Sequence, residues 1–88
     1  MDDKYSLHPS RIVIYTTRSC PDCHRARSYF EEIQIPYLQV GLEGDEKADE
    51  FVRSINQGNR SVPTIIFQDG TILVEPATEE LDRVIRTA

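Results

Sequence analysis

The chain lacks the cysteine pattern and the long apolar segments that would place it outside the cell or in a membrane. It has only two cysteines in 88 residues, whereas small secreted domains carry several well-spaced cysteines as disulfide staples. No apolar run approaches the roughly 18–20 residues that a membrane-spanning helix needs. Residues 1–10 are mostly polar and do not contain the apolar core of a secretory signal. We therefore expect a cytoplasmic protein that does not associate with membranes.

Positive charge is also scarce. The sequence holds 10 lysine and arginine residues against 15 aspartate and glutamate residues, which gives a net charge of −5. A nucleic-acid-binding domain needs a basic surface, and an electrostatic membrane anchor needs a polybasic segment, so the composition argues against both. A chain of 88 residues is long enough for one small domain but not for two. We expect that domain to act as a monomer.

The hydrophobic pattern predicts the order β-α-β-α-β-β-α. The expected strands cover residues 11–16, 37–40, 64–67 and 72–74, and the expected helices cover residues 21–34, 46–56 and 78–86. A helix between the first two strands makes them parallel, and a short turn between the last two makes them antiparallel. We therefore expect an α/β domain over residues 11–88, with a four-stranded mixed sheet flanked by three helices. Residues 1–10 are expected to form a flexible lead-in.

Three local features of these elements are predicted from single residues. Asp69-Gly70 fits the two-residue type I′ turn of a hairpin between the last two strands. Thr78 suits the N-cap of the last helix. Ile33 continues the apolar stripe of the first helix, which is expected to be buried.

The two cysteines carry the chemistry that the sequence predicts. Cys20 and Cys23 follow a buried strand and open a helix, and Pro21 between them suits the first helical position. The thiolate is the reactive form of cysteine, and the free N–H groups at a helix N-terminus stabilise it. Cys20 lies nearer the exposed helix end, so we expect it to attack a disulfide. Cys23 lies on the apolar stripe, and we expect it to resolve the resulting mixed disulfide.

Asp22 is an unusual residue to find between two such cysteines. A carboxylate close to a thiolate opposes formation of that thiolate. We therefore expect Asp22 to make the cysteine pair more reducing, with Arg18, His24 and Arg25 supplying nearby positive charge that offsets it.

The sequence resembles the glutaredoxins of the thioredoxin-fold superfamily. The resemblance covers roughly residues 11–88 and rests on residues 15–23 and on Ser61-Val62-Pro63-Thr64. Residues 58–64, with Phe67 and Asp69-Gly70, look like the mycoredoxin subgroup. The resemblance implies a thioredoxin fold and a thiol–disulfide oxidoreductase without a bound cofactor. Its substrates would be protein disulfides or mixed disulfides with small thiols.

The resemblance also implies a substrate groove beside the cysteine pair. It implies that the Val62–Pro63 peptide bond is cis, that Pro63 faces the cysteines, and that the Val62 backbone pairs with the bound substrate. Exposed backbone groups of this kind accept an extended peptide as an added strand. The remaining candidate substrate-binding residues are Tyr15, Arg18, Pro21, Arg60 and Thr78.

The sequence departs from the glutathione-using members of this family at two places. These usually carry a lysine three residues before the first cysteine, where this chain has Thr17. They also carry a Gly-Gly and acidic run before the last helix, where this chain has residues 74–79. The electron donor is therefore left open between glutathione, mycothiol, another small thiol and a flavoprotein disulfide reductase.

Three other interpretations use the same residues. Cys20, Cys23 and His24 match the attachment motif of c-type haem, for which Met1 or His8 would have to supply an axial ligand. The pair could join His8 and His24 in a zinc site, but zinc fingers carry a second ligand pair further along the chain. Some glutaredoxins bridge an iron–sulfur cluster across a dimer, and a proline after the first cysteine makes this third alternative less favoured.

Overall fold

The computed structural model describes residues 3–87 of the chain, except for the side chain of Thr87. The elements, after a short 3-10 helix η1 (Asp3–Tyr5), are β1 (Ile12–Thr16), α1 (Pro21–Glu32), β2 (Tyr37–Gly41), α2 (Glu46–Ile55), β3 (Thr64–Ile66), β4 (Ile72–Val74) and α3 (Thr78–Thr87). This is the predicted order. None of these helices is long and apolar enough to cross a membrane.

The four strands form one mixed sheet in the order β2-β1-β3-β4. β1 runs parallel to β2 and antiparallel to β3, and β3 runs antiparallel to β4. Tyr15 of β1 lies opposite Val40 of β2 on one side and Thr64 of β3 on the other. The C-terminal end of β1 therefore lies beside the N-terminal end of β3, which brings the segment before Thr64 next to the residues that follow β1.

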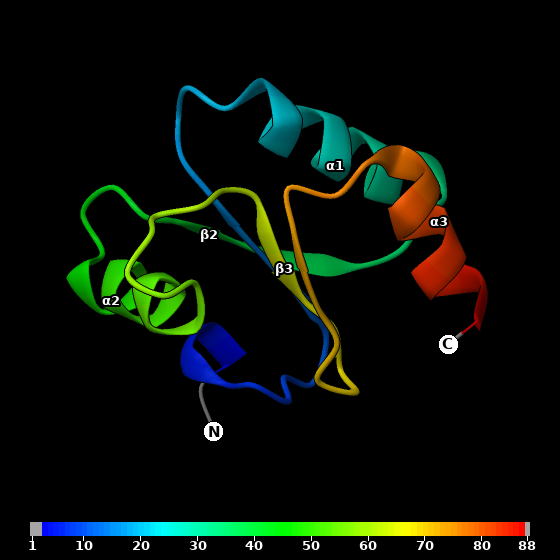
Figure 1. Ribbon diagram of the computed structural model, residues 1–88. Coiled ribbons are helices and arrows are strands. Elements are labelled where there is room, and N and C mark those ends of the chain that lie inside the picture. The colour runs from blue at the N-terminus through cyan, green and yellow to red at the C-terminus, as the bar shows by residue number, and fades with distance from the viewer. Residues whose placement is uncertain (1–2, 88) are drawn as a thin grey trace.

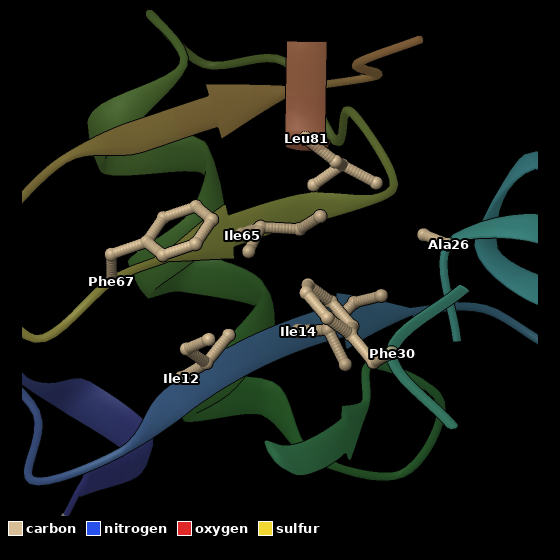
Figure 2. Packing of buried hydrophobic residues seen from close by; sticks show 7 residues of the cluster. All are labelled: Ile12, Ile14, Ala26, Phe30, Ile65, Phe67 and Leu81. Atoms are coloured by element: carbon tan, nitrogen blue, oxygen red, sulfur yellow. The ribbon is translucent and has the colours of Figure 1, made fainter. Parts of the chain in front are cut away.

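Helices cover both faces of the sheet, and β1 is buried throughout (Figure 1). Because side chains alternate along a strand, Ile12 and Ile14 face α1 and α3, whereas Val13 and Tyr15 face α2. Figure 2 shows the first cluster, in which side chains from both helices and two strands converge. Its members are Ile12, Ile14, Ala26, Phe30, Ile65, Phe67 and Leu81. This packing fixes α1 over the sheet, and with it the cysteine-bearing end of that helix.

The hairpin between β3 and β4 differs from the type I′ turn that Asp69-Gly70 predicts. The Phe67 N–H donates to the Thr71 carbonyl and the Gly70 N–H donates to the Phe67 carbonyl, at 2.9 and 3.0 Å. Gly70 has a φ of 93°, but Asp69 does not adopt the positive φ that a type I′ turn requires. The connection is a three-residue loop that ends on a glycine in the left-handed region.

Two predictions about helix ends are wrong. Thr78 is the first residue of α3 and not its N-cap, because the carbonyl of Ala77 already accepts the Leu81 N–H at 3.1 Å. Ile33 lies beyond the end of α1 and is 39% exposed. The apolar stripe of α1 therefore ends at Phe30, which is fully buried.

The segment expected as a flexible lead-in packs against α2. Asp45, the N-cap of α2, accepts a hydrogen bond from Tyr5 Oη and forms an ion pair with Lys4, both at 3.3 Å. The ring of Tyr5 meets Phe51 edge-on. The hydroxyl of Tyr15 donates to the Lys4 carbonyl, so β1 also holds this segment.

Asp45 makes the stability of this corner depend on pH. Asp45 accepts a hydrogen bond from the Ala48 N–H and also interacts with Lys4. These interactions hold the pKa of Asp45 below its usual value of 3.8. Because the folded-state pKa lies below the unfolded one, ionised Asp45 stabilises the fold above pH 3.8, and this contribution is lost as the pH falls through the folded-state pKa. We expect Asp45→Asn to flatten the fall in unfolding free energy below about pH 4, measured by urea denaturation at a series of pH values. Parallel pH profiles of the variant and the parent would contradict this assignment.

Candidate active site

The loop that joins β1 to α1 places both cysteines at the N-terminus of that helix. Cys20 is the N-cap, with an extended backbone at φ −133° and ψ 95°, and Pro21 is the first helical residue. A disulfide joins Cys20 to Cys23, with 5.2 Å between their Cα atoms. Cys20 is partly exposed, whereas Cys23 is 2% exposed and lies on the buried side of α1 with Ala26. The two cysteine residues therefore differ in access to solvent, in the direction that their positions in the sequence predict.

The helix N-terminus provides a hydrogen-bond donor for the sulfur of Cys20. The Cys23 N–H donates to Cys20 Sγ at 3.0 Å, and the His24 N–H donates to the Cys20 carbonyl at 3.1 Å. In the reduced protein the same Cys23 N–H and the positive end of the helix dipole would act on a thiolate at Cys20. Both interactions are stronger with an anion than with a neutral thiol, so they favour the reactive form.

The carboxylate of Asp22 is partly neutralised within its own helix turn. Arg25 Nη1 lies 3.2 Å from Asp22 Oδ1, and both side chains are about half exposed. We expect Asp22→Asn to move the titration midpoint of the Cys20 thiolate to lower pH by about 0.2–0.7 unit, the size typical of an exposed charge interaction. The measurement is thiolate ultraviolet absorbance in a Cys23→Ser background, where Cys20 is the only cysteine.

The matched control for this titration is Arg25→Gln. It releases the Asp22 carboxylate from its ion pair and should move the midpoint in the opposite direction. An unchanged or higher midpoint in Asp22→Asn would show that the carboxylate does not act on Cys20.

A pocket of about 490 Å³ opens beside the disulfide. The loop after β1 forms one wall, the first two turns of α1 form another, and Gln39 of β2 lies on the remaining side. Four of the predicted site residues line it, namely Arg18, Cys20, Pro21 and Cys23. The loop itself is anchored from β2's side of the sheet, because the Arg18 N–H donates to Glu43 Oε2 at 2.8 Å and lowers the pKa of that carboxyl.

The Val62–Pro63 peptide bond is cis, as the sequence resemblance implies. Pro63 is buried and immediately precedes Thr64, which pairs with Tyr15 across the sheet. This register places Pro63 beside the C-terminal end of β1, on the β3 side. The pocket lies on the β2 side, so the two features flank β1. The expected contacts of Pro63 and Val62 with a substrate stay predictions.

The other candidate residues do not line this pocket. Tyr15 is fully buried and faces α2, because strand alternation places it on the opposite face from Thr16, which does line the pocket. Arg60 Nε lies 3.0 Å from Asp49 Oδ1, which ties it to α2. Thr78 is partly buried at the start of α3.

The structure adds a polar network that the sequence does not reveal. Arg27 donates from Nη1 to Gln39 Oε1 at 2.9 Å, and its Nη2 lies 3.5 Å from His24 Nδ1. Gln39 Nε2 in turn donates to Thr16 Oγ1 at 3.2 Å. Arg27 lies one helix turn after Cys23, which is visible in the sequence. Its pairing with Gln39 depends on the register of β2 and on how α1 sits over it.

His8, which the zinc interpretation requires and the haem interpretation offers as an axial ligand, does not lie at the cysteines. Over residues 3–87, no group of three or more histidine, cysteine, aspartate or glutamate side chains is placed to hold a metal ion. The ring of His8 packs against Gly70 in the β3–β4 loop, at the opposite end of β1 from Cys20. Met1, the other axial-ligand candidate for haem, lies outside the described residues.

Comparison with known proteins agrees with this geometry. The family model described as glutaredoxin matches residues 12–72. A Mycobacterium tuberculosis protein named "Putative glutaredoxin Rv3198A" is 41% identical over 70 residues, which cover 80% of this chain and 83% of the relative. Mycoredoxin 1 of Corynebacterium glutamicum is 36% identical over 72 residues, which cover 82% and 89%. The solved glutaredoxin of Archaeoglobus fulgidus has a TM-score of 0.71 at 19% identity, with 86% of each chain covered.

Proposed function

Because this chain belongs to the glutaredoxin family, we propose that it reduces protein disulfides and mixed disulfides of small thiols through Cys20 and Cys23. The observation that carries the proposal is the hydrogen bond from the Cys23 N–H to Cys20 Sγ at the N-terminus of α1. It supports a thiolate on the partly exposed sulfur, while the second sulfur lies behind it in the core.

The proposed reaction transfers two electrons in two exchanges. The Cys20 thiolate attacks one sulfur of the substrate disulfide, forms a mixed disulfide with it, and releases the other sulfur as a thiolate. The Cys23 thiolate then attacks Cys20 Sγ, closes the Cys20–Cys23 disulfide, and releases the second thiolate. The protein ends oxidised and the substrate reduced, so a reductant must restore the two thiols before the next turnover.

We propose that this reductant is a small thiol, with mycothiol and glutathione as the candidates. Thr17 stands where glutathione-using members usually carry a lysine. Because of this difference, mycothiol remains a candidate reductant beside glutathione. A flavoprotein disulfide reductase that acts directly on the protein is the alternative. We place the protein in the cytoplasm, where such systems keep thiols reduced, and expect it to act as a monomer without a bound cofactor.

The function is tested by coupling bis(2-hydroxyethyl) disulfide reduction to NADPH oxidation. Two parallel assays contain glutathione or mycothiol, each with the flavoprotein reductase of that thiol. A third assay contains a flavoprotein disulfide reductase and no small thiol. We expect catalytic NADPH oxidation with at least one small thiol. Turnover only in the assay without one would identify direct reduction by the flavoprotein. Failure of all three, together with no reaction of the pre-reduced protein, would contradict the proposal.

Cys23→Ser separates the one-cysteine route from the two-cysteine route. If a small thiol attacks the mixed disulfide at Cys20, the variant should keep reducing small mixed disulfides, because that thiol replaces Cys23. Reduction of protein disulfides should fall more strongly, since it depends on Cys23 for release. The rates of the variant with both substrate types are compared with those of the parent. Equal loss of both activities would show that the two-cysteine route is obligatory.

A further inference from the structure

We propose that His24 is a further catalytic residue, and that its Nε2–H donates a hydrogen bond to the substrate sulfur that leaves when Cys20 attacks a disulfide. The inference rests on the proposed function and assigns a donor to the leaving side of the first exchange. Cys20 Sγ already has a donor of its own, the Cys23 N–H at 3.0 Å. The attacking sulfur and the leaving sulfur would therefore be stabilised by different groups of α1.

His24 lies one helix turn after Cys20 and lines the same pocket. Side chains four residues apart are neighbours on a helix surface, with Cβ atoms about 5–6 Å apart, and they lean toward the helix N-terminus. The His24 N–H donates to the Cys20 carbonyl at 3.1 Å, so this turn of α1 is formed. Cys20, Cys23 and His24 all line the pocket of about 490 Å³. The imidazole therefore lies beside a disulfide that enters this pocket to react with Cys20.

Arg27 determines which ring nitrogen of His24 is the donor. Arg27 Nη2 lies 3.5 Å from His24 Nδ1. A guanidinium can only donate, so Nδ1 accepts and the ring hydrogen lies on Nε2. Arg27 is itself held in place, because its Nη1 donates to Gln39 Oε1 at 2.9 Å. The ring is thus oriented from the turn that follows it, on the side away from Cys20.

The donor nitrogen of His24 is available to a substrate. His24 is exposed, in contrast to the buried Cys23 that precedes it. Within residues 3–87, the contact with Arg27 is the side-chain hydrogen bond that the ring makes, and it uses Nδ1. Nε2 therefore keeps its hydrogen free for a sulfur atom in the pocket.

The first exchange delivers negative charge to such a sulfur. The Cys20 thiolate bonds to the nearer substrate sulfur while the substrate S–S bond breaks, and the electron pair of that bond stays on the farther sulfur. The three sulfurs are nearly in line, which places the leaving sulfur roughly two S–S bond lengths, about 4–5 Å, from Cys20 Sγ. This distance is close to the spacing between Cys20 and His24 along the helix surface.

A hydrogen bond from Nε2 strengthens as the leaving sulfur becomes anionic. It therefore stabilises the transition state more than the bound disulfide, which is the condition for catalysis. The step moves no proton from His24, and the released thiolate takes its proton from water.

The dependence of the rate on the basicity of the leaving thiolate tests this proposal. The reference protein and all variants carry Cys23→Ser, so that only the first exchange is observed. In reduced form they react with neutral disulfides of graded thiol pKa, from bis(2-hydroxyethyl) disulfide to bis(trifluoroethyl) disulfide. Each rate constant is divided by the fraction of Cys20 present as thiolate, taken from the ultraviolet titration of the same protein. Any effect of a variant on the nucleophile is thereby separated from its effect on the leaving sulfur.

His24→Leu removes the donor and should slow the most basic leaving group most. We expect its rate constant with bis(2-hydroxyethyl) disulfide to fall about tenfold, which corresponds to about 1.4 kcal/mol from one charge-assisted hydrogen bond. With bis(trifluoroethyl) disulfide the fall should be much smaller, because a weakly basic thiolate leaves readily without help. The plot of log rate constant against thiol pKa therefore becomes steeper.

Two further variants separate the donor from the shape of the side chain. His24→Gln carries an amide donor at about the reach of Nε2 and should recover part of the rate. His8→Gln is the matched control, because it replaces the other histidine of the chain, which lies at the opposite end of β1 from Cys20. It should leave the slope of the plot unchanged.

Equal slowing of all disulfides in His24→Leu would overturn the proposal, since that pattern indicates a displaced helix end. The same steepening in His8→Gln, or no recovery in His24→Gln, would overturn it as well. If His24→Leu does not fold, His24→Asn decides, because its shorter amide reaches the place of Nδ1 and not that of Nε2; an unchanged slope would then overturn the proposal. A reference protein that reacts with these disulfides no faster than free cysteine would instead contradict the proposed function.

Discussion

Cys20→Ser should lower the rate of disulfide reduction by at least about 10³-fold, because a serine hydroxyl at neutral pH is a very weak nucleophile toward sulfur. The substitution replaces one atom at the N-cap of α1, and serine is itself a favourable N-cap residue, so the helix should form as before. The rate is measured with bis(2-hydroxyethyl) disulfide in the NADPH-coupled assay. Circular dichroism and urea unfolding confirm that the variant is folded.

Cys23→Ser is the matched control, because it removes the same atom type one turn further along α1. Under the proposed roles, Cys23→Ser keeps the first exchange and accumulates a mixed disulfide on Cys20, which mass spectrometry detects. Cys20→Ser should accumulate none. The reverse pattern, with activity retained in Cys20→Ser and lost in Cys23→Ser, would show that the buried sulfur is the nucleophile.

Phe30→Ala is expected to give the largest loss of stability, about 3–5 kcal/mol of unfolding free energy. Phe30 is fully buried between α1 and the sheet (Figure 2). Its ring centroid lies 5.6 Å from that of Tyr37. Truncation removes apolar contacts and leaves a cavity that the rigid strand β1 cannot close. Small domains are stable by only about 5–15 kcal/mol, so the variant should unfold at a much lower urea concentration.

Ile33→Ala provides the comparison on the same stretch of chain. Ile33 is 39% exposed, so its truncation should cost no more than about 0.5–1 kcal/mol. Urea denaturation of both variants, followed by circular dichroism, measures the difference. A similar small loss in Phe30→Ala would mean that the core between α1 and β1 is not packed as described.

The order of elements and the sheet topology could be predicted because local patterns determine them. The continuous apolar run at 12–16 requires a strand covered on both faces, and the connection lengths decide which strands are parallel. The hairpin type could not be predicted, because Asp69-Gly70 suits both a two-residue turn and a three-residue loop ending on glycine. The choice follows from the pairing of Ile66 with Ile72, which leaves Phe67 outside the strand.

The cysteine pair was predictable because its two residues lie three positions apart in sequence and share one helix end. Tyr15 was harder to place, since alternation along β1 fixes its face only once the face that α1 covers is known. The contact of Arg27 with Gln39 depends on the register between β1 and β2 and on the position of α1. The same limit applies to Lys4 and Tyr5, whose polar sequence context gives no indication of their contacts with Asp45.

The most direct test of the central claim is a single-turnover reaction of the pre-reduced wild-type protein with excess bis(2-hydroxyethyl) disulfide. Released mercaptoethanol and protein thiols are counted, and the oxidised protein is mapped by mass spectrometry. The account predicts two thiols released per protein, loss of both cysteine thiols, and an intramolecular Cys20–Cys23 disulfide as the only new bond. Persistence of both protein thiols, or oxidation to disulfide-linked dimers instead, would contradict it.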